Sequence, residues 1–60
     1  MARYKVLMRI DTAIKNSDKA DLDWADFYCT LRVRIAPNDG RQKYWLEVLE
    51  DVRKAQMQLN

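Results

Sequence analysis

Residues 39–60 read DGRQKYWLEVLEDVRKAQMQLN, and this stretch predicts an amphipathic helix from Asp39 to Asn60. Its apolar residues recur at helical spacing and form one stripe: Trp45, Val48, Leu49, Val52, Ala55 and Leu59. Asp39 can cap this helix, and Gln42 three residues later can complete a capping box. The preceding chain is short for covering such a stripe, so we expect self-association through these six residues.

The length and composition of the chain limit how it can be stabilised. Its 60 residues predict one small domain, residues 1–60, of a size that buries only about 60% of its unfolded surface. Such chains rely on disulfides, a metal, close packing or oligomerisation. With one cysteine and no histidine, an internal disulfide is excluded and a structural zinc site within one chain is out of reach. We therefore expect a homodimer or a larger assembly.

The middle segment fits two interpretations. As a helix from Leu22 to Ala36, it carries an apolar stripe of Trp24, Phe27, Tyr28, Leu31 and Ile35. A second apolar stripe, formed by Ala25, Cys29 and Val33, lies nearly opposite, and Asp21 or Asp23 can serve as the N-cap. Residues 27–35 also alternate between apolar and polar, which is typical of a strand. We favour the helix.

The first segment is equally ambiguous. Residues 2–10 alternate as a strand would, but a helical face continues through Val6, Leu7, Ile10, Ala13 and Ile14, so we favour a helix. The expected fold class is all-α, either a small three-helix bundle or a helical hairpin plus an N-terminal helix. The hairpin would pair antiparallel across the turn at residues 37–40. The alternative is an α+β fold, two strands packed by a C-terminal helix.

The sequence argues against catalysis, cofactors and metals. It lacks histidine, the commonest general base, and Cys29 lies among apolar residues, where a thiol pKa tends to rise. The acidic cluster of Asp18, Asp21, Asp23 and Asp26 lacks the spacing and the glycine of an EF-hand loop. Helix capping explains this cluster best, ahead of a docking patch for a basic partner.

Contact with another protein is the function that the sequence favours. The expected partner-binding residues lie at the start of the last helix or off its main stripe: Arg41, Tyr44, Trp45, Leu46, Arg53 and Met57. Trp, Tyr and Arg are the residues that dominate interface energetics. We expect a regulator, adaptor or inhibitor that acts as a homo-oligomer and occludes or scaffolds a partner protein.

Nucleic-acid binding is the alternative function. Four basic residues bracket the central turn, namely Arg32, Arg34, Arg41 and Lys43, and such residues contact phosphates and base edges well. The net charge of only +2 gives this alternative less weight. No run of about 18 apolar residues is present, so we expect no membrane partner, and the free cysteine indicates a cytoplasmic protein.

Overall fold

A computed structural model describes residues 2–59, which form three α-helices: α1 (Ala2–Asn16), α2 (Lys19–Ile35) and α3 (Asp39–Leu59). The all-α prediction is confirmed. Residues 2–10 and 27–35 are helical, and no strand occurs within residues 2–59, so the α+β alternative is wrong. The last helix follows the prediction from its first residue to Leu59; Asn60 lies outside the described residues.

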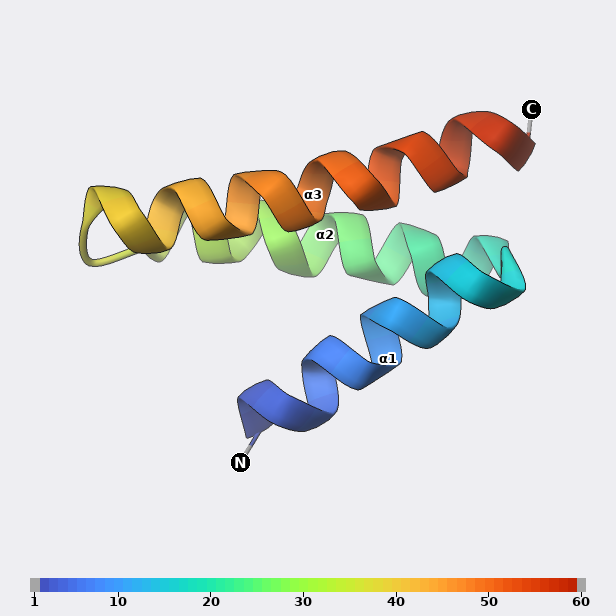
Figure 1. The fold of residues 1–60 in the computed structure, drawn as a ribbon, viewed down its shortest axis with the longest axis horizontal. Coiled ribbons are helices and arrows are strands. Elements are labelled where there is room, and N and C mark those ends of the chain that lie inside the picture. Colours follow the sequence, from blue (N-terminus) through green and yellow to red (C-terminus); the bar gives the residue numbers. More distant parts are fainter. Residues whose placement is uncertain (1, 60) are drawn as a thin grey trace.

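The helices α2 and α3 run antiparallel and make the most extensive contact in the molecule (Figure 1). The predicted hairpin across the turn at residues 37–40 is therefore confirmed. Helix α1 crosses this hairpin obliquely, and its first turns diverge from α2 and α3 (Figure 1). Helix α1 thus covers only part of one side of the α2–α3 hairpin.

Each of the two later helices is capped by a residue that lies earlier in the chain than the sequence suggested. Asp18 is the N-cap of α2, and its carboxylate accepts a hydrogen bond from the backbone N–H of Asp21 at 3.1 Å. The predicted caps, Asp21 and Asp23, are wrong because α2 begins before them, at Lys19. Asn38 likewise accepts from the N–H of Arg41 at 2.8 Å, so Asp39 is the first helical residue rather than the cap.

The connection between α1 and α2 is a tight reversal built around Ser17. Its φ of 52° is left-handed, which is unusual for a residue other than glycine. The N–H of Asp18 donates to the carbonyl of Ala13, and the N–H of Ser17 donates to the carbonyl of Ile14, both at 3.3 Å. This pair of bonds is the Schellman pattern, which satisfies the last carbonyls of a helix.

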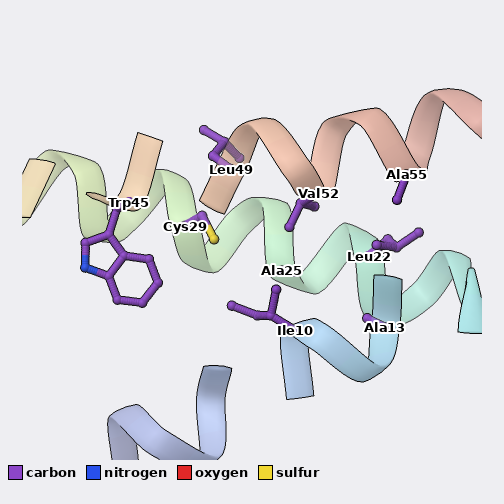
Figure 2. Packing of buried hydrophobic residues seen from close by; sticks show 9 residues of the cluster. All are labelled: Ile10, Ala13, Leu22, Ala25, Cys29, Trp45, Leu49, Val52 and Ala55. Atoms are coloured by element: carbon purple, nitrogen blue, oxygen red, sulfur yellow. The ribbon is translucent and has the colours of Figure 1, made fainter. Parts of the chain in front are cut away.

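The core lies between the three helices and confirms most of the predicted stripe of α3 (Figure 2). Its buried residues are Ile10, Ala13, Leu22, Ala25, Cys29, Trp45, Leu49, Val52 and Ala55. Val48 is half-buried against this core, whereas Leu59 is exposed. The predicted face of α1 is also confirmed, since Ile10 and Ala13 are buried and the other members pack partly against the core.

The buried face of α2 differs from the main stripe that the sequence suggested. Leu22, Ala25 and Cys29 are fully buried, whereas Phe27 and Leu31 of the predicted stripe are exposed. The distance between packed helices depends on the side chains at their contact, so alanine and cysteine permit a close approach of α2 to its neighbours. Ala25 and Cys29 therefore join Leu22 in the core, whereas Phe27 and Leu31 remain outside it.

Candidate interaction surface

Helix α2 carries a row of exposed apolar side chains, Phe27, Leu31 and Ile35, which we call the outer row of α2. Their spacing of four residues places them on one side of the helix. The exposed fraction is 68% for Phe27, 42% for Leu31 and 57% for Ile35. Trp24 and Tyr28, also in the predicted stripe, are half-buried against the core.

Helix α3 carries a second exposed face, formed by Leu46, Glu50, Arg53 and Met57, which we call the outer face of α3. Leu46 is 48% exposed and Met57 73% exposed, so the prediction that both are accessible is confirmed. Together with their neighbours on the same helix, the four residues line a shallow groove that is open to solvent. Leu46, Arg53 and Met57 were predicted from the sequence as partner-binding residues, whereas Glu50 was not, although its position between Leu46 and Arg53 follows from the same spacing.

Arg53 links the outer face of α3 to α2. Its Nε donates a hydrogen bond to Oδ2 of Asp26 at 3.4 Å, and the same carboxyl group accepts from the hydroxyl of Thr30 through Oδ1. Both partners of the ion pair keep some exposure, so its contribution to stability is small. The pair nevertheless holds the guanidinium at the edge of the groove.

Trp45 belongs to an aromatic cluster that spans α2 and α3. Its ring meets those of Tyr28 and Tyr44 edge to face, with centroids 5.8 Å and 5.3 Å apart, and Tyr28 in turn stacks on Trp24 at 5.4 Å. The guanidinium of Arg9 lies 3.9 Å from the Trp24 ring centroid, which attaches α1 to the cluster. Trp45 is 2% exposed, so its side chain is not accessible for the partner binding that the sequence predicted for it.

The four basic residues near the turn divide into one that packs and three that are exposed. The guanidinium of Arg32 lies 5.3 Å from the Trp45 ring centroid, and its buried Nε lacks a hydrogen-bond partner within the described part of the chain. Arg34, Arg41 and Lys43 are exposed. They take no part in the four ion pairs found among the side chains of residues 4–59. The turn end of the hairpin is thus its basic end.

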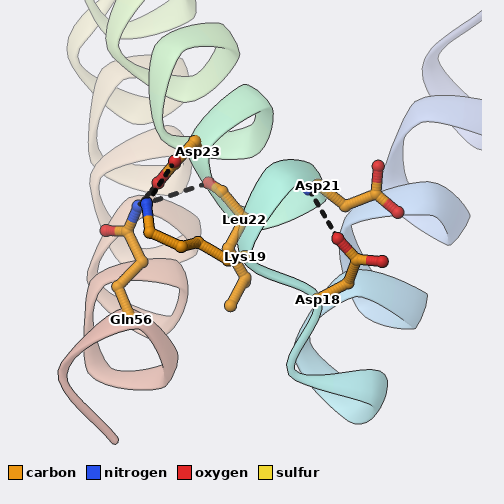
Figure 3. Close-up of polar contacts among 6 residues, drawn as sticks. All are labelled: Asp18, Lys19, Asp21, Leu22, Asp23 and Gln56. Atoms are coloured by element: carbon orange, nitrogen blue, oxygen red, sulfur yellow. Dashed lines mark hydrogen bonds and ion pairs between the residues drawn. The ribbon is translucent and has the colours of Figure 1, made fainter. Parts of the chain in front are cut away.

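The acidic cluster is used within the chain (Figure 3). Asp18 caps α2, Asp21 pairs with Arg9, and Asp26 pairs with Arg53. Asp23 accepts hydrogen bonds from Lys19 at 2.9 Å and from Gln56 at 3.1 Å. The hydrogen bond from Lys19 lowers the pKa of Asp23, against an opposing effect of desolvation. Capping and pairing therefore account for these carboxylates, and no group of residues within 2–59 is arranged to hold a metal ion.

Cys29 is enclosed between the helices (Figure 2). Burial, aided by the nearby charge of Asp26, raises the pKa of its thiol from 9.0 to about 11. The thiolate is the reactive form of cysteine, and it is scarce at neutral pH when the pKa is this high. Cys29 is a small buried hydrophobe, as the sequence suggested.

The residues predicted for self-association now fall into two groups. Trp45, Leu49, Val52 and Ala55 are buried within one chain, against α1 and α2. Leu59 is exposed and Val48 half-buried, so only these two retain surface for a second chain. Self-association itself stays a prediction.

The chain matches no protein-family model, and no curated protein or solved structure is detectably similar to it. None of the described helices is both long and apolar enough to cross a membrane. The exposed surfaces of the three helices are therefore the features that bear on function.

Proposed function

We propose that this chain is a non-enzymatic protein–protein interaction module, a regulator, adaptor or inhibitor that works as a homo-oligomer and occludes or scaffolds a partner protein. The outer row of α2 carries the proposal. The chain closes a core around Leu22 and Cys29, yet Phe27, Leu31 and Ile35 stay in solvent on the other side of the same helix. A contiguous exposed apolar patch is typical of an interaction site.

The outer row of α2 resembles the apolar ridge of a helix that docks in a groove on another protein. Residues at four-residue spacing on one helix present a ridge of side chains to an apolar groove on another protein. Fully burying one such side chain gives roughly 1.5–3 kcal/mol. The entropy lost on association offsets part of the free energy that burial of the whole row would give. A helix already held rigid by α1 and α3 loses little further entropy on docking.

Two features support a role without catalysis. The chain contains no histidine, and its single thiol, Cys29, is buried with a raised pKa. The chain therefore offers neither histidine, the commonest general base, nor an activated thiol. We also propose a cytoplasmic location, because a free buried cysteine suits a reducing compartment.

Site-specific photo-crosslinking in the host cell tests the proposal. A benzophenone amino acid replaces Leu31 in one variant and Thr12, an exposed residue of α1, in a matched control. We expect a protein adduct at position 31 and little or none at position 12. The adduct at position 31 should fall at least about tenfold, or about 1.4 kcal/mol, when Phe27→Ser and Ile35→Ser are added.

The outcomes separate the alternatives. Equal adducts at positions 31 and 12, or none at either, would overturn docking through α2. Circular dichroism on each variant verifies that the helices persist, which is expected because all the altered residues are exposed. An adduct of twice the 7.2 kDa chain mass would identify a second copy as the occupant of the row and remove the support for a different partner there.

Nucleic-acid binding is the second candidate, and the basic end of the hairpin favours it. Arg34, Arg41 and Lys43 are exposed there without an acidic partner among the described residues. Retention on a heparin or DNA column at rising salt tests it, since binding through several phosphates weakens steeply with salt. Elution at the lowest salt, unchanged in Arg41→Ala, would reject this candidate.

A further inference from the structure

The outer face of α3 has the spacing of a helix–helix seam. Leu46, Glu50, Arg53 and Met57 follow one another at intervals of four, three and four residues, which keeps them on one side of the helix. All four are exposed, and they line one groove. From this we infer that the outer face of α3 binds a second copy of the chain through an antiparallel two-fold contact. The inference rests on the proposed homo-oligomer and gives it a surface and a register.

The order of residues along the seam makes it complementary to itself. In an antiparallel contact centred between Asp51 and Val52, Leu46 lies opposite Met57 of the second copy. The same register places Glu50 opposite Arg53 of the second copy, and two-fold symmetry repeats both contacts. A parallel contact would instead place Glu50 against Glu50, which is repulsive. The seam therefore has apolar contacts at its two ends and two charge pairs at its centre.

The charges beside the seam agree with this register. Glu47 and Lys54 both line the groove on α3. When two copies run antiparallel, each lies two residues, or about 3 Å along the helix axis, from the level of the other, a mismatch that long side chains can span. Charged residues beside an apolar seam commonly set the partner and the orientation of paired helices. Here they favour the same antiparallel arrangement as the seam itself.

Arg53 can serve both its own chain and the second copy. Its Nε is hydrogen-bonded to Asp26 of the same chain. A guanidinium has five N–H donors, so the remaining donors of Arg53 are available for Glu50 of the second copy. The contact with Asp26 holds the side chain at the edge of the groove, which reduces the entropy lost on binding.

The size of the contact predicts weak association. Helix α3 has 21 residues and is therefore about 31 Å long. A standard interface buries about 800 Å² on each partner, and a single pair of helices offers less than this. The chain has 4474 Å² of accessible surface, so an interface of the standard size would cover a large share of its surface. We expect a dimer that forms at high micromolar concentration and dissociates on dilution.

Sedimentation equilibrium from about 10 µM to about 1 mM tests the inference, a range that brackets weak association. The average mass of the unaltered chain should rise with concentration toward twice 7.2 kDa. Glu50→Arg should weaken association about tenfold or more, which is about 1.4 kcal/mol, because it turns two attractive pairs into repulsive ones. Adding Arg53→Glu should restore it. Asp51→Arg, the same charge change at an exposed residue outside the seam, should leave it unchanged.

Each result bears on a separate statement. A monomer at every concentration would overturn the inference, while the crosslinking at position 31 tests partner binding independently. If Glu50→Arg leaves the strength of association unchanged, the outer face of α3 is rejected as the contact surface. Failure of the doubly exchanged variant to associate, with its helices intact by circular dichroism, would reject the antiparallel register. Leu46→Ser with Met57→Ser should abolish association without changing any charge, and normal association in that variant would also reject the surface.

Discussion

The two apolar sides of α2 differ in the size of their residues. The inner side, Leu22, Ala25 and Cys29, has no measurable exposure, whereas the outer row from Phe27 to Ile35 is in solvent. By hydrophobicity alone, the outer row would be the better core. On α2, the side that faces the core includes alanine and cysteine, and such small residues suit an interior that is densely packed. Large side chains left outside are available for contact with another molecule.

The largest expected effect separates the two sides directly. Leu22→Ala should reduce the free energy of unfolding by about 2–5 kcal/mol, because it leaves a cavity among α1, α2 and α3. Phe27→Ala removes more apolar atoms but should change stability by less than about 0.5 kcal/mol, since the ring is 68% exposed. Urea unfolding followed by circular dichroism measures both. Comparable losses would show that the outer row also contributes to the core.

A somewhat smaller effect on the free energy of unfolding comes from ionisation of the Cys29 thiol, which lies on the inner side of α2. The pKa of Cys29 is raised to about 11 in the folded chain, so the unfolded chain loses this proton first as the pH rises. The stability advantage of a protonated, buried thiol is therefore complete below pH 9.0 and disappears between pH 9.0 and about 11. The two-unit difference corresponds to roughly 2–3 kcal/mol.

Comparison with Cys29→Ala isolates the contribution of the thiol from those of all other groups in the chain. The difference in unfolding free energy between the two proteins should shift against the cysteine form as the pH rises from 8 to about 11. Urea titrations at several pH values provide the measurement. A constant difference would mean that the thiol is not enclosed in the folded chain.

The smallest of these effects tests the close approach itself. Ala25→Leu adds volume at a fully buried position and should cost about 1–3 kcal/mol through overpacking. Ile35→Leu, a change of shape on the outer row, should cost almost nothing. Thermal unfolding of both variants is sufficient for the test. An Ala25→Leu protein as stable as the unaltered chain would show that spare volume exists between α2 and its neighbours.

The sequence predicts the helices of this fold better than their orientation. The periodicity of α3 and the break at residues 37–40 were enough to predict the hairpin. On α2, periodicity indicated two opposite stripes, and the choice between them depended on how closely α1 and α3 approach. That distance is a property of the packed molecule. The caps were misplaced for a similar reason, since any of several aspartates can cap, and the start of the helix decides which one does.

The candidate surface was predicted in part. Leu46, Arg53 and Met57 were identified because they lie off the main stripe of α3, and the structure leaves them accessible. Trp45 was misjudged, since its ring is enclosed by Tyr28 and by Arg32 across the hairpin. The outer row of α2 was missed as a surface because it was assigned to the core.

The two exposed surfaces share no residue, and this has a consequence for avidity. If two copies join through α3, the outer row of α2 is present twice in one particle. A target that offers two grooves would then be held at both, the second engagement occurring at a high effective concentration set by the first. Individually weak contacts of this small protein would add up to durable attachment on repetitive or dimeric targets, and to only fleeting attachment on single ones.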